Sequence, residues 1–128
     1  MFVAAFASFT LAAQEHSTGS NNTLISVSQL ANVPGHSVTA VEVDLAPGLI
    51  SPTHTHAGFV FVYVLKGTVR SQLNQGEIVE YVAGQSFVEP VGTVHSLTQN
   101  PSTTDTAKLL AIFVAKDDAE LTHDTEHN

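Results

Sequence analysis

The stretch PGLISPTHTHAGFVFVYVLKG, residues 47–67, decides how the rest of the sequence is interpreted. Two histidines, His54 and His56, lie one residue apart in it, between a proline-containing turn and a run of β-branched and aromatic residues. Alternate residues of a β-strand point to the same face, with Cα atoms roughly 6.5 Å apart. If this segment is extended, both imidazoles can reach one metal ion. The alternative is two polar residues at the edge of an ordinary β-protein.

Segments of strand-forming residues surround this stretch, and turn residues (Gly, Pro or Asn) separate them about every 8–12 residues. Such spacing predicts an all-β fold, either a sandwich or a small barrel. No segment before residue 117 has a helical period. The expected strands are residues 24–30, 37–46, 59–65, 68–73, 77–82, 85–90, 93–99 and 107–114.

Composition narrows the classes of partner and of metal ligand. A chain of 128 residues is long enough for one domain with a single core. It contains no cysteine, so a metal ion would need histidine, carboxylate or backbone oxygen ligands. Four basic residues against twelve acidic ones give a net charge of −8, which argues against binding to nucleic acid or to anionic lipid.

A third histidine, His95, occurs in residues 84–100, GQSFVEPVGTVHSLTQN. It begins an expected strand directly after the Pro-x-Gly turn at residues 90–92, and this turn could aim its side chain into a barrel. A single strand histidine is more often a hydrogen-bonded core or surface residue. Catalytic zinc and non-haem iron, however, usually take three protein ligands and keep positions open for water or substrate. Together with His54 and His56, His95 forms a candidate metal site.

The two stretches resemble the two-part signature of the cupin superfamily, G-x5-H-x-H-x3,4-E-x6-G and G-x5-P-x-G-x2-H-x3-N. The resemblance covers about residues 24–115 and implies a jelly-roll β-barrel (a double-stranded β-helix) at residues 23–116. It also implies a divalent metal ion held by the three histidines. The positions in register are Gly48, His54, His56 and Gly67 in the first part, and Gly84, Pro90, Gly92 and His95 in the second.

Two positions depart from this signature. Val60 stands where the family has its metal-binding glutamate, and Gln99 stands where the second part has asparagine. Without the carboxylate, three neutral imidazoles would leave a divalent ion its full +2 charge and favour substrates that coordinate as anions. Cupin dioxygenases with three histidines and no glutamate are known, so Val60 does not by itself exclude a metal. A fourth ligand could come from Gln99, the preferred candidate because it shares strand parity with His95. Glu89 and Gln72 are the other candidates.

The strand expected at residues 59–65 has two different faces. If position 60 faces the metal, Val60 and Val62 line an apolar cavity, and Phe59, Phe61 and Tyr63 face outward. An exposed aromatic row is usually buried against another surface. Small cupins commonly pair, so the resemblance implies a homodimer; the alternative is burial under an N-terminal strand.

Three further side chains are candidates for the lining of the pocket. Gln72 lies on a neighbouring strand, and Phe87 is expected in the core or in the cavity wall. Arg70, the only arginine, would be a carboxylate clamp if it points inward; the alternative is a solvated residue at a strand edge.

The two ends of the chain differ from the barrel. Residues 1–13 are an apolar run that ends in small residues, too short to cross a bilayer but suited to a signal peptide cleaved after Ala12 or Ala13. We therefore expect residues 1–22 to be a signal peptide or N-terminal extension. The protein would be exported (periplasmic or secreted) in the first case and otherwise cytoplasmic. Residues 117–128 carry five acidic residues and no basic one, and they are expected to form a solvated tail.

For function, the sequence favours a metal-dependent enzyme acting on a small anionic or enolisable substrate. Fe(II) is the preferred ion and would suit dioxygenase-type chemistry. Zn, Mn, Ni or Cu would fit the same ligands, because imidazole discriminates poorly among them. A redox-silent ion would suit decarboxylation, isomerisation or cyclisation instead. The alternative is a non-catalytic module that binds a small molecule or a metal.

Overall fold

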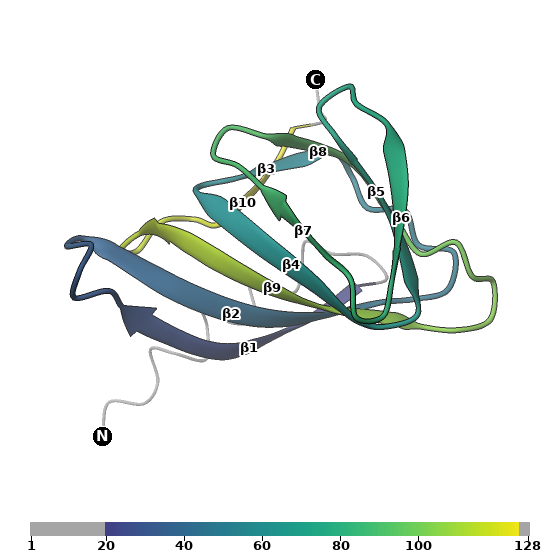
Figure 1. Ribbon diagram of the computed structural model, residues 1–128, viewed down its shortest axis with the longest axis horizontal. Helices are drawn as coiled ribbons and strands as arrows, with labels where there is room; N and C mark the ends of the chain where they lie inside the picture. Colours follow the sequence, from purple (N-terminus) through teal and green to yellow (C-terminus); the bar gives the residue numbers. More distant parts are fainter. Residues whose placement is uncertain (1–19, 126–128) are drawn as a thin grey trace.

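Two five-stranded antiparallel sheets face each other in the computed structural model, which describes residues 20–125 (Figure 1). Sheet A has the strand order β1-β2-β9-β4-β7, and sheet B has the order β10-β3-β8-β5-β6. The strands are β1 (Ser20–Gln29), β2 (His36–Leu45), β3 (His54–His56), β4 (Phe59–Lys66), β5 (Thr68–Leu73), β6 (Ile78–Val82), β7 (Ser86–Glu89), β8 (Val94–Gln99), β9 (Ala107–Lys116) and β10 (Thr122–Asp124).

The chain passes back and forth between the sheets, which is the arrangement of a jelly roll. The prediction of an all-β jelly-roll fold is therefore confirmed. Eight of the ten strands overlap the eight segments expected from the sequence. The first strand begins earlier than expected, at Ser20, within the segment assigned to the N-terminal extension. The two short strands that the sequence pattern does not predict are β3 and β10.

Buried residues alternate with more exposed ones along β4 and β9, and the buried ones form most of the core. Val60, Val62 and Val64 are all buried on the inner face of β4, and the residues of β9 from Ala107 to Ala115 are buried at every second position. β-Branched side chains suit this half-buried, pleated surface. Sheet A therefore presents an apolar inner wall.

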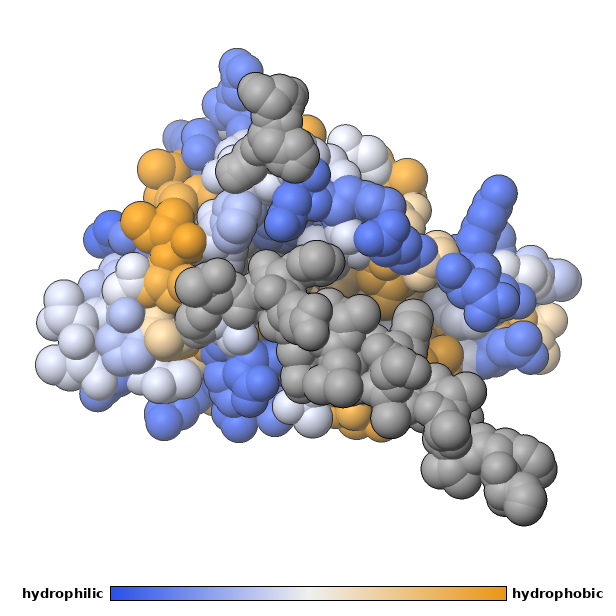
Figure 2. Space-filling view, turned by 180° about the vertical axis from the view of Figure 1, so that it is seen from behind, coloured by the Kyte–Doolittle hydropathy of each residue, from blue (hydrophilic) through white to orange (hydrophobic). Residues whose placement is uncertain are grey.

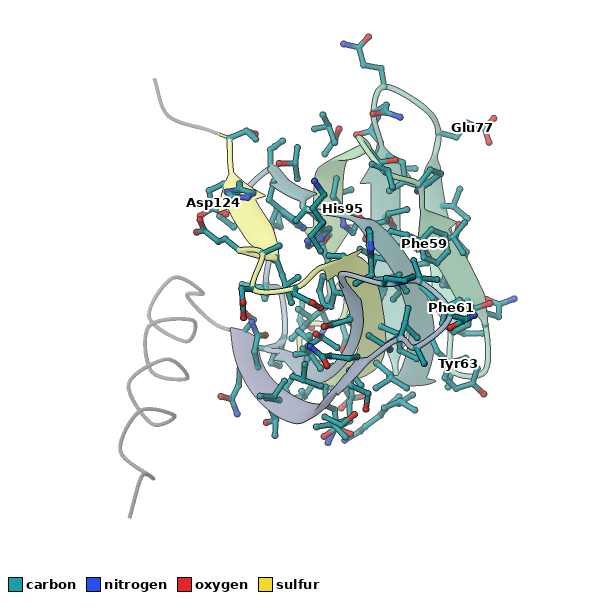
Figure 3. All side chains as sticks on the ribbon, turned by 90° about the vertical axis from the view of Figure 1, so that its left-hand side faces the viewer. Phe59, Phe61, Tyr63, Glu77, His95 and Asp124 are labelled. Carbon is teal, nitrogen blue, oxygen red and sulfur yellow. The ribbon has the colours of Figure 1, made fainter. Side chains whose placement is uncertain are left out.

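The other face of β4 carries Phe59, Phe61 and Tyr63, which point away from the space between the sheets (Figure 3). Their partners on β9 are also apolar, since Phe61 lies opposite Ile112 and Tyr63 opposite Leu110. The two-faced arrangement of this strand agrees with the alternation in the sequence. That a second copy of the chain covers this outer face stays a prediction.

Residues 117–125, expected as part of a solvated acidic tail, are mostly exposed but include a short strand. β10 pairs with β3, with Thr122 opposite His56, and Leu121 packs against the core. Burial of this one leucine is favourable and brings the following backbone alongside β3, where its polar groups are paired. Asp117 is half-buried, whereas Asp118, Glu120, His123 and Asp124 are exposed.

The proposed signal peptide lies almost entirely in residues 1–19, outside the described residues. Residues 20–125 contain no helix that is long and apolar enough to cross a membrane. Seen from behind, the surface has apolar patches separated by hydrophilic regions (Figure 2). The exposed large apolar side chains include Leu24, Ile25 and Val27 on β1 and Ile78 and Val82 on β6, which are edge strands of sheet A and sheet B.

Candidate metal centre

The three histidines singled out in the sequence come together between the sheets. His54 and His56 share one face of β3, and His95 on β8 lies directly opposite His54 in the ladder. One nitrogen of each ring lies within 4.8 Å of the others. Figure 3 shows His95 in the interior, between the two layers.

Two glycines fix the backbone around this cluster. Gly58 separates β3 from β4, and a Cβ at this position would lie 2.1 Å from the carbonyl oxygen of Val114, so only glycine lets the chain pass so close to β9. Gly92 has φ +88°, and the amide of Thr93 donates to the carbonyl of Pro90 at 3.1 Å. This is the type II turn that the Pro-x-Gly sequence favours. It carries the chain from β7 in sheet A to β8 in sheet B.

Backbone carbonyls determine which nitrogen of His54 and His56 is free to bind a metal. Nδ1 of His54 lies 2.8 Å from the carbonyl oxygen of Pro52, and Nδ1 of His56 lies 3.0 Å from that of Leu121. A carbonyl oxygen can only accept, so Nδ1 carries the hydrogen in both rings. Nε2 of each neutral ring then has an unshared lone pair, which is the form that binds metal ions.

Hydroxyl groups orient His95. Its Nε2 lies 2.8 Å from Oγ of Ser71 and 3.0 Å from Oγ1 of Thr98, while its Nδ1 lies 3.1 Å from Oε2 of Glu89. The ring is therefore held from behind by two hydroxyls, and its other nitrogen faces the cluster. Sequence reasoning missed Ser71 and Thr98, since neither belongs to the two motifs.

Glu89, the last residue of β7, brings a carboxylate into the cluster from the opposite sheet. Its side chain is 3 % exposed, and Oε1 lies 3.6 Å from Nε2 of His56. Within residues 20–125 this oxygen has no hydrogen-bond partner. Burial of a carboxylate oxygen without a partner is unfavourable. The sequence suggested Glu89 as a candidate for a fourth ligand, ranked after Gln99.

Burial sets the charge of these groups. Removal from water lowers the pKa of His56 to about 4 and also lowers the pKa of His54. Both rings are therefore neutral at pH 7. Burial by itself would raise the pKa of Glu89, but the hydrogen bond and charge interaction with His95 bring this pKa below its ordinary value. The carboxylate is thus ionised.

These donors fit a divalent transition metal ion. Lone pairs on imidazole nitrogen and carboxylate oxygen are the usual ligands of zinc, iron and manganese in proteins. Donor atoms that share one ion at about 2.1 Å each lie no more than about 4.2 Å apart. The three ring nitrogens lie within 4.8 Å of one another, which is close to this limit. The unpartnered Oε1 of Glu89 is an independent sign that a positive charge belongs here.

Gln99 does not share the inward face with His95 as predicted, because β8 contains a bulge. Leu97 pairs with Gln72 on β5, whereas the next pair joins His95 to Leu73, which leaves one extra residue on β8. The bulge inverts the alternation after His95. Thr98 consequently takes the inward position, and Gln99 lies outward.

Two of the expected pocket residues also face away from the site. Ser71 points at His95, so its neighbours Arg70 and Gln72 lie on the opposite face of β5. Arg70 donates to Glu80 on β6 at 2.7 Å, and Gln72 donates to the carbonyl of Gly76. An inward Arg70 would have to bury its guanidinium without a partner, whereas the outward position gives it a carboxylate. Arg70 and Gln72 therefore do not line the pocket, and for Arg70 the alternative of a solvated strand residue is the one that the structure has.

The three apolar residues expected in the pocket face the interior. Val60 and Val62 are part of the inner wall of sheet A, and Phe87 follows them on β7, opposite Val62. The Phe87 ring stacks on Tyr81 and lies with its centroid 6.0 Å from that of His95. These side chains form the apolar side of the candidate site.

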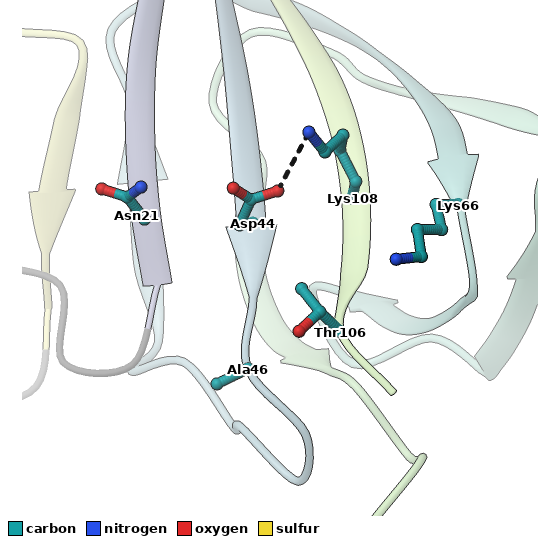
Figure 4. A pocket seen from close by; sticks show the side chains of 6 residues that line it. All are labelled: Asn21, Asp44, Ala46, Lys66, Thr106 and Lys108. Carbon is teal, nitrogen blue, oxygen red and sulfur yellow. Dashed lines mark ion pairs between the residues drawn. The ribbon is translucent and has the colours of Figure 1, made fainter. Parts of the chain in front are cut away.

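Two surface hollows differ in how near they lie to the histidine cluster. The larger, about 440 Å³, is lined by Asp44, Lys66 and Lys108 at the end of sheet A, where an ion pair joins Lys108 to Asp44 (Figure 4). It has no contact with the histidines. The smaller, about 290 Å³, lies against the β5–β6 hairpin and is lined in part by Ser71 and Tyr81. Ser71 therefore lies between this smaller hollow and His95.

Solved structures similar to this one are cupins at low sequence identity. The polyketide cyclase RemF from Streptomyces resistomycificus has a TM-score of 0.66 at 17% identity, with 88% of this chain and 75% of that chain covered. A cupin-like protein from Thermotoga maritima also has a TM-score of 0.66, at 16% identity, covering 86% of this chain and 79% of that one. KdgF from Halomonas sp. has a TM-score of 0.61 at 22% identity, covering 78% and 82%.

No curated protein sequence matches the chain. The structural similarities, all below 25% identity, establish the fold alone. A family model described as a cupin domain matches residues 41–113, which is more than half of the chain and includes the three histidines and Glu89. With its jelly roll of two antiparallel sheets and a histidine cluster between them, the chain belongs to the cupin family.

Proposed function

We propose that this protein binds one divalent transition metal ion at His54, His56 and His95 and uses it to transform a small organic substrate. The observation that carries the proposal is the convergence of three ring nitrogens within 4.8 Å. The carbonyls of Pro52 and Leu121 support it, because they fix two of the rings in the form that can bind a metal. Fe(II) is our preferred ion, with Zn, Mn, Ni or Cu as alternatives.

A bound ion would supply Lewis-acid polarisation of a substrate oxygen or, in the case of iron, redox chemistry with dioxygen. The chain would supply positioning. Ser71 and Thr98 hold the ring of His95 in place, and Val60, Val62 and Phe87 keep one side of the site apolar and free of water. Exclusion of water strengthens electrostatic interactions within such a site.

The proposed substrate is a small anionic or enolisable molecule that enters from the β5–β6 side. The hollow there has a volume of about 290 Å³, near the lower end of the range for small-molecule sites. A negative substrate oxygen would be attracted to a divalent ion whose ligands are mostly neutral. The similarity to a polyketide cyclase is compatible with a cyclisation or an isomerisation. Dioxygenase-type chemistry is the other candidate reaction.

Metal analysis of the purified protein tests the proposal. We expect one equivalent of metal in the wild type by mass spectrometry, or after anaerobic loading with Fe(II). His56→Ala should lose it, with affinity lowered more than about 100-fold, beyond the usual effect of losing only an outer partner. His123→Ala is the matched control, because His123 is an exposed histidine on β10 outside the cluster. Equal metal content in the two variants would contradict the proposal.

Turnover separates the enzyme from the alternative of a binding module. The loaded protein should consume dioxygen, or convert substrate without it, with at least one member of a panel of β-diketones, thiols and aromatic acids. Stoichiometric metal without turnover of any panel member would favour a module that binds a metal or a small ligand without chemistry.

A further inference from the structure

The carboxylate that the cupin signature places at position 60 has a counterpart on the neighbouring strand. Val60 occupies the signature position on β4, is 1 % exposed and faces the interior. Its direct partner across the ladder between β4 and β7 is Glu89. Side chains directly opposite each other in an antiparallel pair project from the same face, with Cβ atoms about 5 Å apart. Glu89 therefore enters the interior beside the place where the family glutamate would start.

The two oxygens of Glu89 contact two of the three histidines. Oε2 lies 3.1 Å from Nδ1 of His95, and Oε1 lies 3.6 Å from Nε2 of His56. Separations of roughly 3.0–4.2 Å are those expected between donor atoms that share an ion about 2.1 Å away. The carboxylate thus lies against two of the three histidines, at the edge of the cluster.

The contact between Glu89 and His56 places two lone pairs against each other. Nδ1 of His56 donates to the carbonyl of Leu121, so Nε2 of the neutral ring carries no hydrogen. Oε1 of Glu89 has no hydrogen-bond partner among the described residues. Two acceptors that face each other without a proton repel, unless a cation lies between them.

Apart from the contact of Oε2 with the ring of His95, the described residues bring no charged partner to Glu89. All four basic residues lie within residues 20–125, and none of them forms an ion pair with Glu89. Arg70 pairs with Glu80, and Lys108 pairs with carboxylates on β2. A buried carboxylate without a compensating charge is strongly unfavourable. The site therefore calls for a positive ion from solution.

We infer that Glu89 is the fourth protein ligand of the metal ion and replaces, from β7, the carboxylate that the cupin signature supplies from β4. This inference rests on the proposed function. It changes the expected chemistry, because a divalent ion with one carboxylate ligand keeps a charge of about +1 in place of +2. It also changes the expected metal preference, since a carboxylate favours Mn(II) and Fe(II) relative to an all-imidazole set.

The first test compares Glu89→Gln with Glu80→Gln, which removes the same charge at an exposed position on β6. Affinities for Mn(II) and Zn(II) are measured by titration calorimetry or competition with a chelator. We expect Glu89→Gln to weaken Mn(II) binding by about 100-fold and Zn(II) binding by less, because zinc is well served by imidazole. Glu80→Gln should bind both as the wild type does. A residue that only orients His95 would lower both affinities equally.

The second test moves the carboxylate back across the ladder. The double variant Val60→Glu with Glu89→Gln should regain at least ten-fold of the lost Mn(II) affinity, because position 60 faces the same interior space. Unfolding curves in excess chelator show whether each variant is folded. Glu89→Asp, which keeps the charge but shortens the side chain, serves if the amide variant is unstable, and it too should weaken Mn(II) more than Zn(II).

The outcomes separate this inference from the proposed function. Wild-type protein that binds no metal would overturn both. Stoichiometric metal in the wild type, with unchanged affinities and an unchanged Mn(II)-to-Zn(II) ratio in Glu89→Gln, would leave the three-histidine site standing and overturn the role of Glu89. An equal fall for both ions, without recovery in the double variant, would also overturn it.

Discussion

The inner faces of the two sheets differ in chemistry although they enclose the same space. The wall that sheet A contributes is mainly apolar, and Glu89 brings a carboxylate into it at the end of β7. The wall that sheet B contributes carries polar side chains that point at one another. The inward residues of sheet A include Val60, Val62, Val64, Leu109 and Phe113, and those of sheet B include His54, His56, Ser71, His95 and Thr98.

This difference shows how the fold accommodates a polar site in a small interior. The apolar wall provides the burial that stabilises the jelly roll, and the polar groups of sheet B satisfy most of their hydrogen bonds within the same sheet. Changes in the first wall should therefore alter stability, and changes in the second should alter metal binding. Each prediction below tests that division.

The largest effect is expected in the apolar wall. Leu109→Ala should lower the free energy of unfolding by about 2–5 kcal/mol, because Leu109 on β9 is part of the buried core and the shorter side chain leaves a cavity. Urea denaturation in excess chelator measures this change. Metal affinity should be unaffected, since Leu109 lies about 13 Å along the strand from Phe113, the residue that contacts His56. Leu110→Ala, on the outer face of the same strand, is the control and should cost less.

Lowering the pH should destabilise the metal-free protein through the polar wall. The pKa of His56 falls from 6.5 in the unfolded chain to about 4 in the folded protein, so the unfolded state binds a proton that the folded state does not. Stability is therefore complete at pH 7 and falls by about 3 kcal/mol on the way to pH 4.

The lowered pKa of His54 acts in the same direction and pH range. Glu89, whose pKa is also lowered, contributes stability that disappears only at still lower pH, as the carboxylate takes up its proton. Urea denaturation at each pH in chelator measures the sum. A stability that stays constant from pH 7 to pH 5 would contradict the burial of neutral histidines.

Ser71→Ala should have an intermediate effect that appears in metal affinity. Loss of the hydroxyl that contacts Nε2 of His95 frees the ring to rotate, and we expect metal binding 10- to 100-fold weaker. Calorimetric titration measures it. Ser86→Ala, on the outer face of β7, is the control and should bind as the wild type. A fall in stability without a change in affinity would assign Ser71 to the core instead.

The smallest effect is expected outside both walls, at the larger surface hollow. Lys108 pairs there with Glu42 and Asp44 at 3.4 and 3.5 Å, but solvent screens these contacts. Lys108→Met should unfold at the same denaturant concentration as the wild type and bind metal equally well. A shift in either measurement would show that this hollow, although larger, is coupled to the interior.

The sequence predicted the strands because their signals are local. Alternation in residues 59–65 and turn residues between segments require no knowledge of distant contacts. The three histidines were also accessible, because two lie one residue apart and the third follows a turn of recognisable type. By contrast, β10 depends on one leucine in an acidic segment, and its pairing with β3 is a long-range contact that no local pattern records.

The errors at the site come from two features of tertiary structure. Strand parity predicted an inward Gln99, but the bulge between His95 and Leu97 inverts the alternation. The sequence of residues 94–99 contains no signal for this bulge. Arg70 and Glu80 lie opposite each other on β5 and β6, and pairing them requires the register of that hairpin. Glu89 could be named as a candidate ligand from its position before the turn. To rank it above Gln99 required knowledge of the strand pairing between β4 and β7.

That ladder has a consequence for how relatives of this protein should be compared. A motif written as spacings along the chain treats positions 60 and 89 as unrelated, although they are adjacent in space. If the carboxylate moves from one of these positions to the other, it still points into the interior, but the sequence no longer matches the motif. Homologues with an apolar residue at the glutamate position of the signature deserve inspection at the cross-strand partner before they are classified as having lost their acidic ligand.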